Sequence, residues 1–413
     1  MIRCRSALGE RLGGSRPLLL GVIVVGCLLA LLSAIRFQAP ELLGQHKVLT
    51  DFDAFYIAGL LGRGGRVSEA YHLASLIAAQ KVAYGTTSFM PWTYPPPFTL
   101  AMQCLAALPL GAAFLLFSLG SFALYLRVLS RIAGQWLPGV VVAVTPAIIL
   151  NLRTGQNGLL IAGVIGAFLL AFRDGRKVAG LPLGLLIIKP HLAVGAGLLV
   201  LLHRRWSVVL IAGAVGLVLL TISTLAYGPA VWGHFRDAVT EAAGFLAAGY
   251  YQFFRMNSIY ATAHSLGAGP AAAMALQICG AFAALGTLAY AYFKGIPFNR
   301  LAALACAASV CVSPYGYDYD LTVLGVGAAF VMPDILERAT TGQFLSLSAL
   351  MWPVCGYGMA WTVIASRDDV GSGVTLDGSD TGVALIAPAL FVLFWLTFRV
   401  LSQPRPAHNA APV

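Results

Sequence analysis

The sequence predicts an all-α protein that crosses a membrane many times, and three observations support this fold class. Hydrophobic residues make up 59% of the 413-residue chain, whereas charged residues make up only 10%. Apolar runs long enough to cross a hydrocarbon core about 30 Å thick recur along the whole chain. No run alternates polar and apolar residues as in a porin-type barrel, and unclosed strands cannot span lipid. We therefore expect residues 1–413 to form a single integral-membrane domain of about 11–13 transmembrane helices.

The first apolar run covers residues 17–35 and has its positive flank on the N-terminal side. The basic residues before it are Arg3, Arg5, Arg11 and Arg16. Because positive flanks stay in the cytoplasm, the following segment, 36–92, is expected outside. Residues 68–82 within it are amphipathic and can lie flat on the membrane surface. Segment 36–92 is therefore predicted to be a first extracytoplasmic loop with interfacial helices, and it is the best candidate for a catalytic loop.

Residues 94–227 are expected to form core helices, but the apolar runs between 94 and 202 allow two topologies. If five separate runs all span the membrane, the basic turn 173–177 lies outside, against the positive-inside rule. If 94–131 crosses once and 178–202 is a broken hairpin with Lys189-Pro190-His191 at its tip, that turn lies inside. We favour the second topology. Proline frees backbone groups, and such breaks persist at membrane depth only against protein or a wet cavity.

The rest of the chain fits an alternating topology. One helix is expected near 206–227, before a second outside loop, 228–269. The C-terminal helices of segment 270–402 are expected near 270–293, 299–313, 317–333, 343–365 and 381–402. The basic segments 203–205, 294–300 and 337–338 and the basic tail then fall inside. The second loop, segment 313–320 and the acidic loop 366–380 fall outside, on the same side as the first loop.

The formal charge of +10 does not indicate a nucleic-acid partner. The basic residues cluster at helix ends, where membrane orientation and anionic lipid explain them. The seven cysteines lie mostly in apolar runs without a CxxC pair, so we predict neither a disulfide framework nor a cysteine metal site. No cofactor is indicated with certainty.

Two carboxylates, Asp51 and Asp53, follow the first membrane run in the segment TDFDAFYIAG. Carboxylates this close to a bilayer are scarce, and at the outer surface an acid or base can meet a lipid headgroup but not a cytosolic nucleotide. Residues two apart in a helix point about 200° away from each other. The two carboxylates therefore do not share one site unless the segment is extended.

Several short motifs occur in a fixed order along the chain. They are Asp51-Phe52 with Tyr56 and Ala58, Ala70-Tyr71, Tyr94-Pro95-Pro96-Pro97-Phe98, Gly155-Gln156-Asn157, Ala179-Gly180 to Lys189-Pro190, Asn257-Ser258 and Ser313-Pro314-Tyr315. With this order over roughly residues 15–335, the chain resembles glycosyltransferase family 87 of the GT-C superfamily, which includes polyprenyl-phosphate-mannose-dependent mannosyltransferases.

The resemblance implies a GT-C-type helical bundle in a bacterial-type plasma (inner) membrane, with its active site outside the cytoplasm. It also implies a polyprenyl-phosphate sugar as donor, usually of mannose or a related sugar, and a lipid or glycan as acceptor. Membrane lipid is the surrounding partner, and no nucleic acid is expected. A divalent cation is possible, but the sequence names no metal ligands.

Asp51 matches the family's first-loop aspartate and is our candidate for the general base. A carboxylate beside the donor sugar can take the proton of the acceptor hydroxyl as an oxocarbenium-like transition state forms. A single displacement with one base inverts the anomeric centre. Asp53 is the second catalytic candidate, and the alternative role of Asp51 is to cap the helix that follows it.

The charge of the leaving lipid phosphate must be offset by fixed cations or donors. The candidates are Lys189, His191 and Arg255. Lys189 lies deep in an apolar run, where an unpaired ammonium is expensive. A phosphate is one partner for it, and an internal ion pair with Asp318 or Asp320, or snorkelling, is the alternative.

Further polar and aromatic residues are candidates for binding the sugar or the acceptor. They are Tyr56, Tyr94, Gln156, Asn157, Asn257, Tyr315, Tyr317, Asp318 and Asp320. Many family members carry a tryptophan and a histidine in the last of the motifs, where this chain has Tyr317, Asp318 and Tyr319. The role of Asp318 is therefore left open between orienting the donor, binding a divalent cation and pairing with Lys189.

A secondary transporter or flippase of lipid-linked sugars is the alternative function. About twelve helices with broken segments and a buried lysine and aspartate also suit alternating access. A transporter of this kind is expected to show related halves. No internal repeat is visible, and the polar residues gather on one face, so the transferase is favoured.

Overall fold

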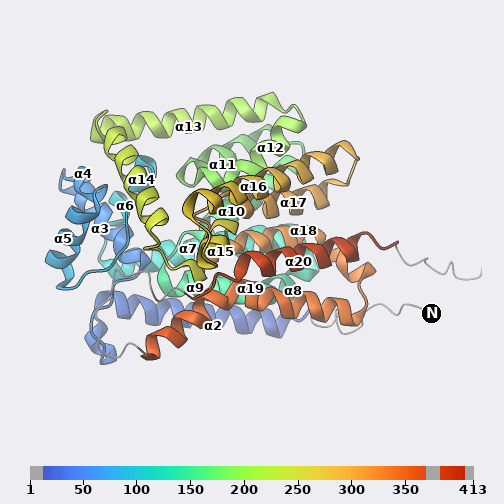
Figure 1. Cartoon of the computed structure of the whole chain (residues 1–413), viewed down its shortest axis with the longest axis horizontal. Coiled ribbons are helices and arrows are strands. Elements are labelled where there is room, and N and C mark those ends of the chain that lie inside the picture. The colour runs from blue at the N-terminus through green and yellow to red at the C-terminus, as the bar shows by residue number, and fades with distance from the viewer. Residues whose placement is uncertain (1–12, 369–381, 405–413) are drawn as a thin grey trace, which may run out of the picture.

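The chain forms a bundle in which most of the long helices run along one common direction (Figure 1). The computed structural model describes residues 13–368 and 382–404. Within these ranges no strand is formed, and one isolated antiparallel bridge joins Met256 to Tyr317. The prediction of an all-α polytopic protein is confirmed.

The helices follow the apolar runs of the sequence. Among the described residues, six are long and apolar enough to cross a membrane: α2 (Arg16–Gln38), α7 continued by α8 (Leu110–Ala133 and Leu137–Ala143), α13 (Trp206–Tyr227), α16 (Pro270–Phe293), α18 (Thr322–Arg338) with the turn before it, and α19 (Thr341–Asp368). Five shorter apolar segments accompany them, which contain α10 (Gly158–Arg173), α11 (Gly180–Leu185), α12 (Val194–Leu202), α17 (Phe298–Val312) and α20 (Ile386–Leu401). The number expected from the sequence is reached only when these shorter segments are included.

The remaining helices belong to the loops or extend the core. They are α3 (Asp51–Arg63), α4 (Val67–Ala70), α5 (Leu73–Tyr84), α6 (Pro96–Leu105), α9 (Thr145–Thr154), α14 (Val231–Ala248) and α15 (Ile259–Ser265). Helices α4 and α5 cover the amphipathic stretch 68–82, so its helical nature is confirmed.

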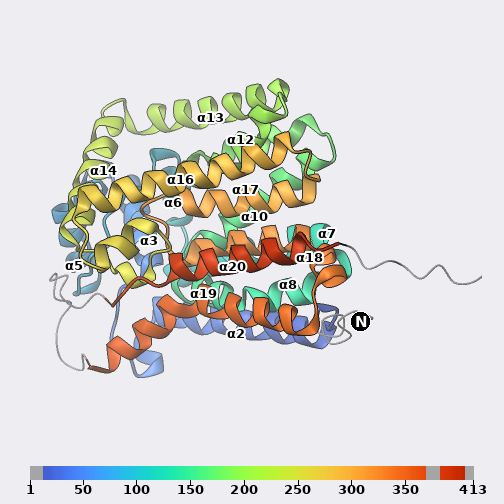
Figure 2. The same cartoon turned by 45° about the vertical axis from the view of Figure 1, so that its right-hand side comes forward.

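Consecutive core helices run in opposite directions. A Cβ on Gly111, at the start of α7, would lie 3.1 Å from the carbonyl of Ala34 in the last turns of α2. Further along α7, the ring of Phe122 would lie 3.4 Å from a Cβ on Gly26, nearer the start of α2, so α2 and α7 are antiparallel. The bundle therefore has two ends. We call the end with α3–α6, α14, α15 and residues 313–320 the loop end, and the opposite end the basic end (Figures 1 and 2).

Segment 177–202 enters and leaves at the basic end. Gly180 and Gly184 of α11 pack in turn on the backbone of Val208 and Ala212, so α11 runs parallel to the first half of α13. The chain then breaks at Lys189, and α12 returns to reach α13 through residues 203–205. The structure thus has the broken hairpin of the favoured topology, with Lys189-Pro190-His191 at its tip.

Segment 94–131 contains one long helix rather than two. Helix α6 has ten residues and lies beside α3, where Gly59 touches the backbone of Met102. Only α7 is long enough to cross the membrane. The first and second loops also pack together, because the backbone N–H of Leu73 donates to Glu241 at 3.2 Å.

The distribution of charge follows the two ends. The described residues at the basic end include Arg16, Arg127, Arg131, Arg173, Arg176, Lys177, Arg204, Arg205, Lys294, Arg300, Arg338 and Arg399. The guanidinium of Arg205 lies 5.1 Å from the ring centroid of Phe172, which places turns 173–177 and 203–205 together. Arg3, Arg5 and Arg11, most of the acidic loop 366–380 and most of the basic tail lie outside the described residues.

Candidate active site

Helix α3 presents Asp51 and Asp53 in its first turn. Thr50 is the N-cap residue, and its backbone N–H donates to Asp53 Oδ2 at 2.8 Å. Asp53 therefore performs the capping role that the sequence left open for Asp51. The segment is helical rather than extended, so the two carboxylates face different surroundings, as the helical geometry requires.

Asp53 is fully buried in an ion pair. Lys47 Nζ donates to Asp53 Oδ1 at 2.6 Å and to the carbonyl of Phe37 at 3.0 Å. The same ammonium lies over the rings of Phe37 and Tyr84, 5.2 Å and 4.6 Å from their centroids. Burial raises the pKa of Asp53, and Lys47 and the Thr50 N–H offset part of this rise. Lys47 thus ties the start of α3 to the end of α2 and to α5.

Asp51 is half-buried and makes no hydrogen bond or ion pair within the described part of the chain. Its charge nevertheless interacts electrostatically with a defined group of side chains at the loop end. They are Tyr94, Arg255, Tyr317, Asp318 and Tyr319. A free carboxylate at the first position of a helix is favoured by the helix dipole. Asp51 is thus available to take a proton beside a cluster of cationic and hydroxylated side chains.

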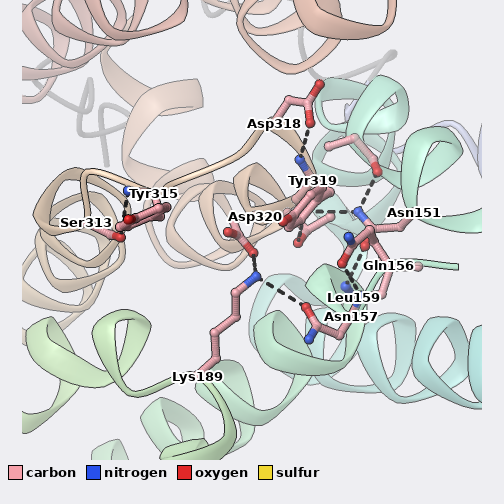
Figure 3. A network of polar contacts seen from close by, with 12 residues as sticks. Asn151, Gln156, Asn157, Leu159, Lys189, Ser313, Tyr315, Asp318, Tyr319 and Asp320 are labelled. Atoms are coloured by element: carbon pink, nitrogen blue, oxygen red, sulfur yellow. Dashed lines mark hydrogen bonds and ion pairs between the residues drawn. The ribbon is translucent and has the colours of Figure 1, made fainter. Parts of the chain in front are cut away.

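Residues 317–320 belong to this cluster, and Figure 3 shows Asp318, Tyr319 and Asp320 with their polar neighbours. The rings of Tyr317 and Tyr319 are stacked, with centroids 5.3 Å apart and planes 1° from parallel. Asp318 and Asp320 alternate with them, and both are fully buried. The backbone of Tyr319 is held by Asn151, whose Nδ2 donates to its carbonyl at 3.0 Å. Glycine is needed at position 158, because a Cβ there would collide with this carbonyl.

Each of the two aspartates is paired with a cation. Lys189 Nζ donates to Asp320 Oδ1 at 2.6 Å and to Asn157 Oδ1 at 3.3 Å. Arg255 donates to Asp318 from Nε at 3.3 Å and from Nη2 at 3.2 Å. Lys189 therefore has the internal partner that the sequence offered as the alternative to a phosphate, and that partner is Asp320.

Arg255 comes from the second loop and is held beside segment 313–320 by main-chain contacts. Met256 bridges to Tyr317, and the backbone N–H of Asn257 donates to the carbonyl of Gly316 at 2.9 Å. Burial acts to lower the pKa of Arg255, but Asp318 and Asp51 act against it, and the pKa is raised overall. The Arg255 side chain keeps 16% of its surface exposed, so a permanently charged guanidinium borders the cluster.

Tyr94 links the Asp51 region to the buried ion pair. Its hydroxyl lies beside the Asn157 amide, and its pKa is raised by burial and by the charges of Asp320 and Asp51. Its backbone carbonyl accepts from Tyr71 Oη at 3.2 Å, and its ring packs 5.3 Å from that of Phe55 on α3. The Tyr94 hydroxyl is therefore a neutral O–H group close to both carboxylates.

The structure brings most of the predicted residues together. Asp51, Tyr94, Asn157, Lys189, His191, Arg255, Tyr317, Asp318 and Asp320 belong to one contiguous region. Tyr319, Asn151 and Lys47 were not among the predicted site residues. The sequence signals were the position of Tyr319 between two predicted aspartates and that of Lys47 six residues before Asp53, whereas Asn151 had no such signal.

The other predicted residues, all in the described part of the chain, have no side-chain hydrogen bond with the two ion pairs. Tyr56 donates to the carbonyl of Leu108 at 2.9 Å, away from the cluster. The Oε1 atom of Gln156 accepts from the backbone N–H of Asn157 at 3.3 Å. Asn257 and Tyr315 lie beside Gly316 and Tyr251, and their buried side-chain polar atoms have no hydrogen-bond partner.

The described residues do not converge on a metal site. No group of three or more His, Cys, Asp or Glu side chains is arranged to hold an ion among them. Asp318 and Asp320 are each paired with a basic side chain instead. The residues present therefore do not fit the divalent cation considered from the sequence, and we derive no step through one.

Comparison with known proteins identifies the family. The model of glycosyltransferase family 87 matches residues 92–314, which is more than half of the chain. Asp51 and residues 317–320 lie outside the matched segment. No curated protein and no solved structure matches the chain. With six candidate membrane helices among its described residues and this family match, the chain belongs to glycosyltransferase family 87 and is a multi-pass membrane glycosyltransferase.

Proposed function

We propose that this protein transfers a sugar from a polyprenyl-phosphate donor to a lipid or glycan acceptor at the extracytoplasmic face of the plasma membrane. The observation that carries the proposal is the free, half-buried carboxylate of Asp51 beside Arg255, Tyr94 and Asp318. A mannosyl or related hexosyl group is the expected cargo, in keeping with the family resemblance.

Asp51 acts as the general base in this proposal. It takes the proton of an acceptor hydroxyl while that oxygen bonds to the anomeric carbon of the donor. The bond between the anomeric carbon and the phosphate oxygen breaks, and the polyprenyl phosphate leaves. A single displacement of this kind inverts the anomeric centre. Asp53 does not serve as a second base, since its carboxylate is occupied by Lys47 and by the helix cap.

Arg255 is the proposed ligand of the donor phosphate. Its pairing with Asp318 uses two donors of the guanidinium, and the remaining N–H groups of an arginine can meet a phosphate. Lys189 and His191 lie deeper, at the break between α11 and α12, and Lys189 is neutralised by Asp320. These contacts support Arg255, rather than Lys189 or His191, as the proposed phosphate ligand.

The extracytoplasmic location is supported by the charge of the two ends. Positively charged loops remain in the cytoplasm, and the basic end carries the turns 173–177 and 203–205. The loop end, with Asp51 and Arg255, is then outside, where a lipid-linked donor rather than a soluble nucleotide sugar is available. The family match favours this transferase over a transporter or flippase of lipid-linked sugars.

Replacement of the proposed base tests the proposal. The Asp51→Asn variant should transfer labelled sugar from polyprenyl phosphate about 100- to 10,000-fold more slowly than the wild type. Expression and donor binding should be largely unchanged, because the amide keeps the size of the side chain.

Asp237→Asn is the matched control. Asp237 is an exposed carboxylate at the same end of the molecule and pairs with Arg236 in α14, so its loss should leave turnover intact. Undiminished transfer by Asp51→Asn would assign the base to another residue. Absence of transfer by the wild type from every polyprenyl-phosphate sugar tested would refute the donor class.

A further inference from the structure

Buried polar atoms near Lys189 have no hydrogen-bond partner, and Figure 3 shows two of the residues concerned, Asn157 and Asp320, at the ammonium. Within the described residues these atoms include Asn157 Nδ2, Asp320 Oδ2 and His191 Nε2. Asn157 and Asp320 both bind the Lys189 ammonium through their other oxygen, and His191 lies two residues along the same chain break. Leaving one buried polar group unpaired costs about 1–3 kcal/mol. Three such atoms around one lysine therefore indicate a place where another polar group binds.

Lys189 determines which atoms are left free. An ammonium has three donors and no acceptor, so it must face the oxygen of the Asn157 amide rather than its nitrogen. The Nδ2 group of Asn157 is then directed away from the ammonium and has no hydrogen-bond partner among the described residues, while the Tyr94 hydroxyl lies beside the amide. In the same way, the short contact to Asp320 Oδ1 leaves Oδ2 as a free acceptor.

A free donor next to a free carboxylate oxygen complements a hydroxyl group. A hydroxyl can accept from Asn157 Nδ2 and donate to Asp320 Oδ2 at the same time. A phosphate oxygen has no proton for Asp320 and would be repelled by its charge. The pairing of Lys189 with Asp320 also removes the net positive charge that would attract a phosphate.

The subsite adjoins the Asp51 region. The Tyr94 hydroxyl lies beside Asn157, and the charges of both Asp320 and Asp51 interact with this hydroxyl. Asn157 and Asp320 are themselves 0% exposed, so a sugar reaches them only after a local opening. The half-buried Tyr94 is the side chain next to both parts of the site.

We propose that Asn157 and Asp320 form a subsite that binds a hydroxyl group of the donor sugar, and that Lys189 is its positioning residue. The inference rests on the proposed function, because it takes the ligand to be the sugar of a polyprenyl-phosphate donor. It changes the role of Lys189 from binding the phosphate to orienting the two groups that recognise the sugar.

Binding measurements separate these two roles. Full-length protein in lipid nanodiscs is titrated with sugar-free polyprenyl phosphate and with a panel of polyprenyl-phosphate hexoses and pentoses. In Asp320→Asn the hydroxyl loses its acceptor, so the affinity for the preferred sugar-bearing lipid should fall about 10- to 100-fold. The affinity for the sugar-free lipid should not change. If Lys189 binds phosphate instead, removal of the Asp320 charge frees it, and both lipids should bind more tightly.

A reciprocal variant guards against a simple loss of folding. Asn157→Asp keeps an oxygen for Lys189 but removes the free donor, so it should also weaken only the sugar-bearing lipid. The double variant Asn157→Asp/Asp320→Asn exchanges donor and acceptor and keeps one carboxylate for Lys189. It should bind the sugar-bearing lipid more tightly than either single variant.

Asp334→Asn is the control, because Asp334 pairs with Arg300 at 2.9 Å at the basic end, and it should leave both affinities unchanged. The subsite is refuted if the wild type binds no sugar-bearing lipid more tightly than the sugar-free lipid, or if Asp320→Asn affects both lipids equally. Sugar-dependent binding without transfer would instead refute the proposed reaction and leave the subsite standing.

Discussion

At the residue scale, the first turn of α3 shows how two neighbouring aspartates acquire different roles. Asp53 accepts from the Thr50 N–H and from Lys47, so its charge is used within the fold. Asp51 has neither partner and faces the second loop and residues 317–320. The Lys47–Asp53 ion pair stabilises the start of the helix, and the Asp51 carboxylate remains without an ion-pair partner among the described residues.

Removal of Lys47 should destabilise the protein. Lys47→Met leaves the fully buried Asp53 without its cation, and breaking a buried ion pair in this way costs about 3–5 kcal/mol. Heat-induced unfolding of the purified variant should begin at a clearly lower temperature than that of the wild type. Lys47→Arg, which keeps the charge, should lose less. Equal unfolding temperatures for Lys47→Met and the wild type would contradict the role assigned to this pair.

Residue identity alone predicted only part of the site. Asp51, Lys189, Arg255 and Asp318 could be selected because charged groups are scarce in this chain and expensive near lipid. Which aspartate pairs with Lys189 could not be predicted, because Lys189 and Asp320 are 131 residues apart in sequence. The sequence offered Asp318 and Asp320 equally as partners, and only the position of the break between α11 and α12, which brings Lys189 to Asp320, separates them.

At the element scale, the close approach of α10 to segment 317–320 sets the position of the stacked tyrosines. Asn151 Oδ1 accepts from the backbone N–H of Leu159 at 3.3 Å, and its Nδ2 donates to the Tyr319 carbonyl. One side chain thus joins α9, α10 and the tyrosine segment. The absence of a side chain at Gly158 makes this approach possible.

A methyl group at position 158 should disturb the site. Gly158→Ala forces the Tyr319 carbonyl outward, and overpacking of this kind costs about 1–3 kcal/mol. We expect lower thermal stability together with reduced transfer, measured on the same preparation. Gly197→Ala in α12 is the matched control, because no atom lies within 4 Å of its added Cβ. Wild-type behaviour of Gly158→Ala would show that the contact is not needed.

At the scale of the whole molecule, the sequence predicted the positions of the long helices well. The bounds of α13 and α16 agree with the expected 206–227 and 270–293, because long apolar runs end at clear polar or glycine signals. The region 94–202 was ambiguous for a physical reason. Its apolar segments are short, and hydrophobicity does not distinguish a crossing from a hairpin that turns back inside the protein.

The orientation of the molecule can be tested with cysteine reporters in a background without native cysteines. Asp237→Cys at the loop end should react with a membrane-impermeant maleimide added to intact cells. Lys177→Cys at the basic end should react only after the membrane is opened. The reverse pattern would place Asp51 in the cytoplasm and contradict the proposed extracytoplasmic reaction.

The stacked tyrosines have a consequence for how a donor is recognised. The Arg255 guanidinium lies 5.7 Å from the ring centroid of Tyr317, and the Lys189 ammonium lies 4.7 Å from that of Tyr319. Two parallel rings thus form a rigid spacer between the cation proposed for the phosphate and the cation that orients the hydroxyl subsite. The spacer thereby fixes the separation of the two cations. A lipid that carries only the phosphate and a lipid that carries only the sugar should therefore together gain less binding free energy than the intact donor.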